Sequence, residues 1–247
     1  MVKNSVVKKS IRGKRAAKQS GGVGRWRVLN KLLDALLPYY CRGCGKTGRL
    51  LCEKCRGEIE IVGEVKGRDL GDLRALYAGG YRTGALEKLV KDYKFKSIKK
   101  ASEILAEILD EAVASMEKVV NGAELSKIIV VPLPTIKKHI RERGFDHAKR
   151  LAEEFAKRRG LEVRSILRRV NKTVQVGADE ETRRKQAEEA YIAEELDPRK
   201  TYLLIDDVWT TGASMRAAAK KLREAGVEKI YGIVVEIGAG TEDVLLG

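Results

Sequence analysis

The sequence predicts an α/β fold in which helices flank a mainly parallel sheet, with a small four-cysteine zinc finger near the N-terminus. The apolar runs IIVV (128–131) and YLLI (202–205) are typical of strands buried on both faces of a parallel sheet. Segments with helical spacing of apolar residues alternate with such runs, which favours parallel strands joined by helices. Four cysteines form one cluster before the first run, so the finger precedes the sheet.

Apolar spacing predicts four helices after the cysteines and one further strand. The strand is KIYGIVVEI (229–237), and glycines at 160 and 226 are placed to end the last two helices. The predicted helical faces are Leu86, Leu89, Val90 and Tyr93; Ile104, Leu105, Ile108, Leu109 and Val113; Ala148, Leu151, Ala152 and Phe155; and Met215, Ala218, Ala219 and Leu222.

The stretch YLLIDDVWTTGAS (202–214) places polar chemistry at the end of a predicted strand. Two adjacent carboxylates, Asp206 and Asp207, follow the apolar run, and small hydroxylated residues then lead into a predicted helix. This position is the carboxyl end of a strand, where open α/β sheets bind ligands. We therefore expect a ligand site between residues 206 and 214.

The residue types in this stretch suit a sugar phosphate. A helix N-terminus attracts phosphate through its unpaired N–H groups and partial positive charge. Gly212 lets the backbone approach closely, while Thr210, Thr211 and Ser214 supply hydroxyl groups. The carboxylates would repel phosphate and instead suit sugar hydroxyls or a divalent metal ion. A ribose 5′-phosphate satisfies both halves; the alternative is a buried strand followed by an Asp-rich turn and a helix cap.

The cysteines have the spacing of a structural zinc site. Each C-x-x-C pair lets two thiolates reach one ion, and two pairs close a tetrahedron around Zn²⁺. Redox activity and paired disulfides are the alternatives. Four protein ligands leave no open coordination position, so the metal is expected to fold the segment and not to catalyse. The four ligands are Cys41, Cys44, Cys52 and Cys55.

The N-terminal region is strongly basic. The 247-residue chain has a formal charge of +15, and residues 1–27 hold nine Lys or Arg and no acid. We expect a basic disordered tail over 1–25, which either is only solvated or contacts nucleic acid or acidic lipid. An apolar helical face follows from Trp26 to Leu37. The tail lacks the apolar region of a secretory signal and no run approaches the ~20 residues of a membrane span, which favours a cytoplasmic location.

YLLIDDVWTTGAS resembles the loop that binds phosphoribosyl pyrophosphate (PRPP) in type I phosphoribosyltransferases. The resemblance implies that Asp206 and Asp207, the catalytic candidates, hold the ribose 2′- and 3′-hydroxyls of PRPP bound with Mg²⁺. It also implies that the following loop wraps the 5′-phosphate, through Thr210, Thr211, Gly212, Ala213 and Ser214. Trp209 is bulky for such a loop.

The chain from about Leu32 to Glu236 is similar to the ComF family of competence-associated proteins, which combine a zinc finger with a type I phosphoribosyltransferase domain. The stretches that carry the resemblance are LLDALLPYYCRGCG, KDYKFKS, VPLPTIKKHIRERGFDHAKRLA and QVGADEETRRKQAEEAY. Asp146 and His147 stand where the family usually has Asn-Gln, and Lys185-Gln186 replace part of its R-x-x-N. We interpret His147 as either a polar contact or an acceptor-site group.

Two further segments take roles from this resemblance. The segment after the 128–131 strand corresponds to the pyrophosphate loop, where backbone amides and side chains neutralise the leaving group. Its candidates are Thr135, Lys137, Lys138, Arg141 and Arg143. The charged segment 168–190 is either a lid over PRPP, with Arg183, Arg184 and Lys185 reaching the pyrophosphate, or a helical arm with solvated charges. The patch Lys94, Lys96, Lys99 and Lys100 is either a solvated face or a phosphate or nucleic-acid contact.

The predicted domains are the tail (1–25), a helix with the zinc finger (26–62) and a phosphoribosyltransferase-like domain (63–247). Two functions follow from the resemblance. One is transfer of phosphoribosyl from Mg-PRPP to an unknown acceptor, and the other is a non-enzymatic PRPP-sensing module that binds single-stranded DNA during DNA uptake or recombination. The sequence leaves a homodimer open.

Overall fold

The computed structural model describes residues 39–96, 98–118, 127–169, 191–194 and 196–238. The predicted tail (1–25), the apolar helical face from Trp26 to Leu37 and the predicted lid residues Arg183, Arg184 and Lys185 lie outside these ranges. The described residues from 40 to 238 belong to one compact unit that holds both the cysteines and the sheet. The predicted domain boundaries stay predictions.

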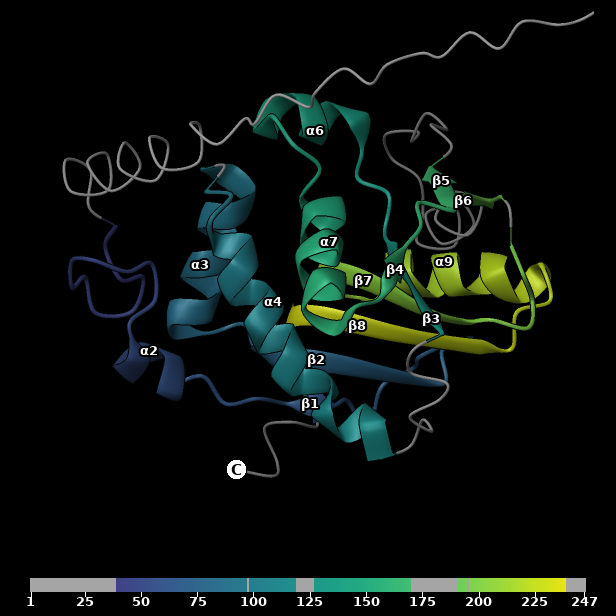
Figure 1. Cartoon of the computed structure of the whole chain (residues 1–247), viewed down its shortest axis with the longest axis horizontal. Helices are drawn as coiled ribbons and strands as arrows, with labels where there is room; N and C mark the ends of the chain where they lie inside the picture. The colour runs from purple at the N-terminus through teal and green to yellow at the C-terminus, as the bar shows by residue number, and fades with distance from the viewer. Residues whose placement is uncertain (1–38, 97, 119–126, 170–190, 195, 239–247) are drawn as a thin grey trace, which may run out of the picture. The chain divides into compact units, whose positions relative to one another are not determined.

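A mainly parallel sheet confirms the predicted α/β fold. In the described part of the chain it has six strands in the order β1-β2-β8-β7-β3-β4 (Figure 1), and only the β1–β2 pair is antiparallel. The strands are β1 (Gly63–Glu64), β2 (Ala75–Tyr81), β3 (Ile128–Pro132), β4 (Glu162–Val163), β7 (Thr201–Trp209) and β8 (Lys229–Ile237), while β5 (Leu167–Arg169) and β6 (Tyr191–Ala193) form a separate antiparallel pair. The three predicted strands are thus β3, β7 and β8.

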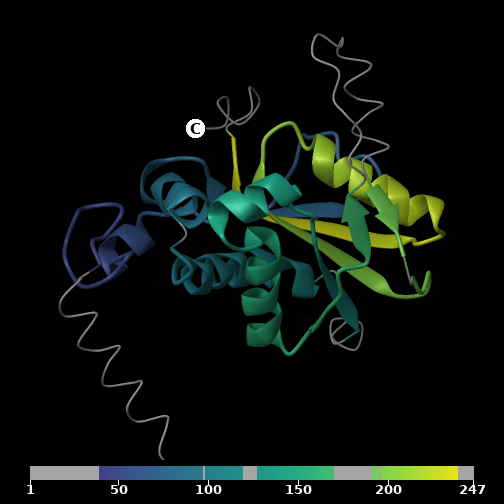
Figure 2. The same ribbon diagram turned by 90° about the horizontal axis from the view of Figure 1, so that it is seen from above.

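Helices cover both faces of the sheet, as expected for parallel strands joined by helical crossovers. Helices α4 and α7 pack against one face and α9 against the other, on opposite sides of the sheet in Figure 2. The described helices are α2 (Glu53–Gly57), α3 (Gly84–Phe95), α4 (Ala101–Ala112), the 3₁₀ helix η1 (Val113–Lys118), α6 (Lys137–Arg143), α7 (His147–Arg159) and α9 (Ala213–Glu224). None of them is long and apolar enough to cross a membrane.

Strand β2 was missed by sequence reasoning because ALYAGGY lacks a continuous run of strand-forming residues. Its close packing explains the composition. A Cβ on Gly79 would lie 2.6 Å from the Val235 backbone oxygen on β8 and 2.5 Å from Ile108 Cγ2 on α4. Glycine is therefore needed where this strand meets both its neighbour and the covering helix.

The cysteine segment packs on the core through ion pairs at two places. Arg42, between the first two cysteines, pairs with the buried Asp92 of α3. Arg56 of α2 pairs with Glu111 of α4. The finger is thus attached to the two helices that precede β3 in the chain.

Candidate functional site

The two adjacent carboxylates of β7 have different environments. Asp206 is half-buried, and its Oδ1 accepts a hydrogen bond from the Asp207 backbone N–H at 2.9 Å. Asp207 is only 3% exposed. Because successive side chains of a strand point to opposite faces, the buried acid and the more open one face different surroundings.

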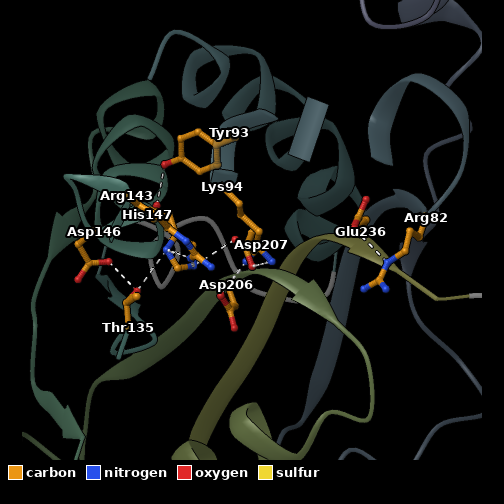
Figure 3. Close-up of polar contacts among 10 residues, drawn as sticks. All are labelled: Arg82, Tyr93, Lys94, Thr135, Arg143, Asp146, His147, Asp206, Asp207 and Glu236. Atoms are coloured by element: carbon orange, nitrogen blue, oxygen red, sulfur yellow. Dashed lines mark hydrogen bonds and ion pairs between the residues drawn. The ribbon is translucent and has the colours of Figure 1, made fainter. Parts of the chain in front are cut away.

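Two cation-capable side chains from different helices meet Asp207. Lys94 Nζ of α3 lies 2.8 Å from Oδ1, and His147 Nε2 at the start of α7 lies 3.2 Å from Oδ2 (Figure 3). Burial acts to raise the pKa of Asp207, but the charge of Lys94, with His147, outweighs it and lowers that pKa. Asp207 is therefore the charged member of the pair.

The pKa of Asp206 is shifted in the opposite direction. Burial, and then the charge of Asp207, raise its pKa well above the ordinary value. Two neighbouring carboxylates that share a site commonly separate in this manner, because both cannot carry charge cheaply. A ligand that donates hydrogen bonds, or a cation, would stabilise the charged form of Asp206.

The contacts of His147 define its protonation state. Arg143 NH1 lies 2.8 Å from Nδ1, and a guanidinium can only donate, so Nδ1 accepts. The ring proton then sits on Nε2, where it faces Asp207. Burial lowers the pKa of His147 and, with the charges of Arg143 and Lys94, outweighs the opposing charge of Asp207. His147 is therefore neutral at pH 7.

The start of α7 is held in place by three hydrogen bonds. Asp146 caps the helix by accepting from the Lys149 N–H at 3.1 Å, and it also accepts from Thr135 Oγ1 at 2.9 Å. Tyr93 of α3 donates its hydroxyl to the His147 carbonyl at 2.7 Å. Together these bonds hold the backbone that carries the His147 imidazole near Asp207 (Figure 3).

The loop after β7 presents an open helix N-terminus. Thr210, Thr211 and Ser214 are exposed, and the N-cap residue of α9, Gly212, has no side chain that could cap the helix. The Ala213 N–H makes only a long contact of 3.4 Å with Thr211 Oγ1. Backbone N–H groups of the first turn and nearby hydroxyls are the donors that a phosphate requires.

Gly212 is fixed by the indole of Trp209, which is buried beneath it. Gly212 has a φ of +73°, and a Cβ there would lie 2.1 Å from the Trp209 ring. Trp209 thus supports the loop from below. We expect Gly212→Ala to reduce the free energy of unfolding by about 2–4 kcal/mol, from backbone strain plus overpacking. Urea denaturation measures the change.

Gly160→Ala is the matched control, because Gly160 has a φ of +65° but no atom within 4 Å of a new Cβ. It should lose only about 1–2 kcal/mol, the conformational part alone. Equal losses in the two variants would contradict a supporting role for the indole.

The predicted pyrophosphate-loop residues take different positions. The structure places 137–143 in the short helix α6 and not in a loop. Lys137, Lys138 and Arg141 are exposed, and Lys138 pairs loosely with Glu142 at 3.9 Å. Arg143 and Thr135 turn toward the start of α7, where Arg143 contacts His147 and Thr135 donates a hydrogen bond to Asp146.

Some residues of the site were missed by sequence reasoning. Lys94 follows Val90 by four residues on the apolar face of α3, and a lysine on such a face was the available signal. Glu236 of β8 lies opposite Val208 and is paired with Arg82 at 3.1 Å (Figure 3). Burial raises the pKa of Glu236 to about 7.

The four cysteine sulfurs fit a zinc ion. They lie within 4.8 Å of one another and form no disulfide. The Cys44 and Cys52 sulfurs are 3.6 Å apart, close to the about 3.8 Å expected of tetrahedral Zn–S bonds. Although burial acts to raise it, backbone hydrogen bonds from residues 44, 52 and 43 lower the pKa of Cys41 to about 6. Burial and the neighbouring sulfurs raise the pKa of Cys55 to about 12. A cation relieves this crowding of sulfurs.

A second group of metal-capable atoms is formed by His147, Asp206 and Asp207, which also lie within 4.8 Å of one another. Carboxylate oxygens suit Mg²⁺, whereas an imidazole does not. The Lys94 ammonium already pairs with Asp207 Oδ1, and His147 Nε2 lies 3.2 Å from Oδ2 without a hydrogen bond. Asp206 is therefore the member that fits a hard cation.

The fold and the site define an α/β protein with a mainly parallel sheet, an acid pair on β7 and a cluster of four cysteines in the N-terminal part of the described chain. Among curated proteins, the chain is similar to Competence protein F of Haemophilus influenzae (strain ATCC 51907 / DSM 11121 / KW20 / Rd). The two are 28% identical over 204 residues, which cover 77% of this chain and 86% of that protein. No family model matches the chain. The similarity confirms the predicted ComF resemblance.

Proposed function

We propose that the protein binds PRPP with Mg²⁺ at the carboxyl end of β7 and transfers its phosphoribosyl group to an acceptor, releasing pyrophosphate. The observation that carries the proposal is the half-buried Asp206 beside the open N-terminus of α9. The phosphate-binding donors at 210–214 follow Asp206 by four to eight residues. One short loop therefore carries both the carboxylate and the donors that a ribose 5′-phosphate requires.

The chain's own residues would act by positioning and by charge. Asp206 would accept from a ribose hydroxyl and hold Mg²⁺, and residues 210–214 would hold the 5′-phosphate. Asp207 would orient its neighbour while Lys94 and His147 hold it in place. Arg143 would supply positive charge for the departing pyrophosphate. When bound, Mg²⁺ would neutralise part of the pyrophosphate charge.

Calorimetric titration of Mg-PRPP into the parent protein and Asp206→Asn tests the proposal. Asn keeps the shape but removes the charge, so we expect affinity to fall about ten-fold or more, the value of a charge-assisted hydrogen bond. Asp110→Asn is the control, because Asp110 is a partly exposed carboxylate of α4 paired with Arg159. No binding by folded parent protein would refute the proposal.

A second candidate function is a non-enzymatic module that binds PRPP as a signal and also binds single-stranded DNA. The similarity to a protein named Competence protein F favours it, together with the exposed cations of α6. Such binding would weaken steeply with salt, because counterions are released from the phosphates. Release of pyrophosphate with a defined acceptor separates the enzyme from the module.

A further inference from the structure

We propose that Phe95, held by Arg143, is a stacking platform for the planar ring of a nucleobase at the edge of the candidate PRPP site. The ring would belong either to a free base or nucleoside or to one base of a single strand. The inference rests on the proposed function, in which the neighbouring site binds PRPP. It deepens that function because it names the class of compound that would lie beside the phosphoribosyl group.

Phe95 is the most exposed large hydrophobic residue in the described part of the chain. It is 72% exposed, compared with 51% for Tyr40 and 41% for Ile192. One exposed apolar residue is ordinary on a protein surface. The contacts around Phe95 are what make it informative.

One guanidinium joins the exposed ring to the buried site. The Arg143 Cζ atom lies 5.3 Å from the centroid of the Phe95 ring, while NH1 of the same side chain lies 2.8 Å from His147 Nδ1. His147 in turn contacts Asp207. The neighbour of Phe95 in α3, Lys94, reaches Asp207 directly. The exposed Phe95 ring is thus linked, through Arg143 and Lys94, to the side chains that contact Asp207.

A second phenylalanine, just before α7, also lies beside a cation. The ring of Phe145 lies 5.3 Å from that of Tyr93 in an edge-to-face arrangement, and Lys99 Nζ lies 5.7 Å from its centroid. Phe145 is half-buried and Lys99 is exposed. Each of the two phenylalanines therefore carries a cation on or near its face.

Aromatic faces interleaved with cations match a nucleobase more closely than a lipid or an apolar protein surface. Every base has a π face that stacks on phenylalanine, and the nearby cations suit its phosphates. A lipid or protein partner would need a continuous apolar patch, whereas the residues that follow Phe95 in the chain include the exposed lysines 96, 99 and 100.

Quenching of 2-aminopurine fluorescence on stacking tests the platform in the full-length protein. The probes are 2-aminopurine riboside and an oligothymidine carrying one central 2-aminopurine, each titrated with parent, Phe95→Ala, Phe95→Tyr and Ile192→Ala. We expect Phe95→Ala to weaken binding at least about five-fold, the lower end for loss of one stacking side chain. Phe95→Tyr should restore binding, and Ile192→Ala should match the parent.

The two probes separate the sources of the ring. Weakening with the riboside assigns the platform to a free base or nucleoside, and weakening with the oligonucleotide alone assigns it to a strand; either result supports the inference. Equal binding of both probes by parent and Phe95→Ala, or no binding by the parent, overturns it. Titration of the parent protein with PRPP is a separate measurement. It can therefore refute the PRPP site while the stacking platform is supported, or support the PRPP site while the platform is refuted.

Discussion

Loss of the metal from the cysteine cluster is expected to unfold the segment around residues 41–57 and to loosen its attachment to α3 and α4. Zinc bound by four cysteines contributes about 10–16 kcal/mol of apparent binding energy at pH 7, and this energy folds the segment. Without it, four crowded sulfurs remain around Cys41 with no cation to hold them. We expect one zinc per chain by elemental analysis, and none in Cys41→Ser.

Hydrogen exchange locates the effect. The N–H groups of Cys41, Gly45 and Arg56 donate to backbone carbonyls within the segment, so their protection should disappear in Cys41→Ser. Amides of the central strands β3 and β7 should keep theirs. Arg49→Gln is the control, because Arg49 is exposed in the same segment and pairs with the exposed Glu53. Full protection in metal-free protein would contradict a structural zinc site.

Replacing Lys94 by Met is expected to destabilise the protein by about 3–5 kcal/mol, because it leaves the charge of Asp207 buried without its main partner. Both side chains of the pair are largely buried, with exposed fractions of 18% and 4%. Urea denaturation at pH 7 measures the loss. Lys91→Met, on the same helix but in an exposed pair with Glu87, should change stability little.

The double variant Lys94→Met/Asp207→Asn distinguishes a broken pair from a poorly packed methionine. It should recover much of the loss, because no unpaired charge then remains. Acid gives a second check. The pKa of Asp207 is below its ordinary 3.8 in the folded protein, so its stabilisation is present above 3.8 and is lost as pH falls through the lowered value. A double variant no more stable than Lys94→Met would contradict the pair.

Local pattern was sufficient to predict the central strands, because a strand buried on both faces needs a continuous apolar run and few other structures do. Predicted IIVV and YLLI became β3 and β7, and KIYGIVVEI became β8 over the same residues. The cysteine positions were equally local, since ligand spacing within each knuckle follows from chain geometry. Strand β2 was not predicted, because close packing at Gly79 requires glycine where a strand usually has larger apolar side chains.

Helix α6 shows a similar limit. KKHIRER has one apolar residue and buries none of its side chains, so no periodic face indicated a helix. The position of α6 is important because its last residue, Arg143, contacts His147. The sequence places Arg143 among the pyrophosphate candidates, and that role stays a prediction. The contact that the structure shows is the one with His147.

The sequence by itself determined the α/β architecture, the four metal-capable cysteines and the acid pair before an open helix N-terminus, because each depends on residues close together in the chain. Only the tertiary structure decided which acid is buried and charged. Lys94 and His147 come from two helices and meet at Asp207, and Arg143 of a third helix holds the imidazole from behind. Such a charge network depends on distances in space, which set both the cost of burial and the pairing that offsets it.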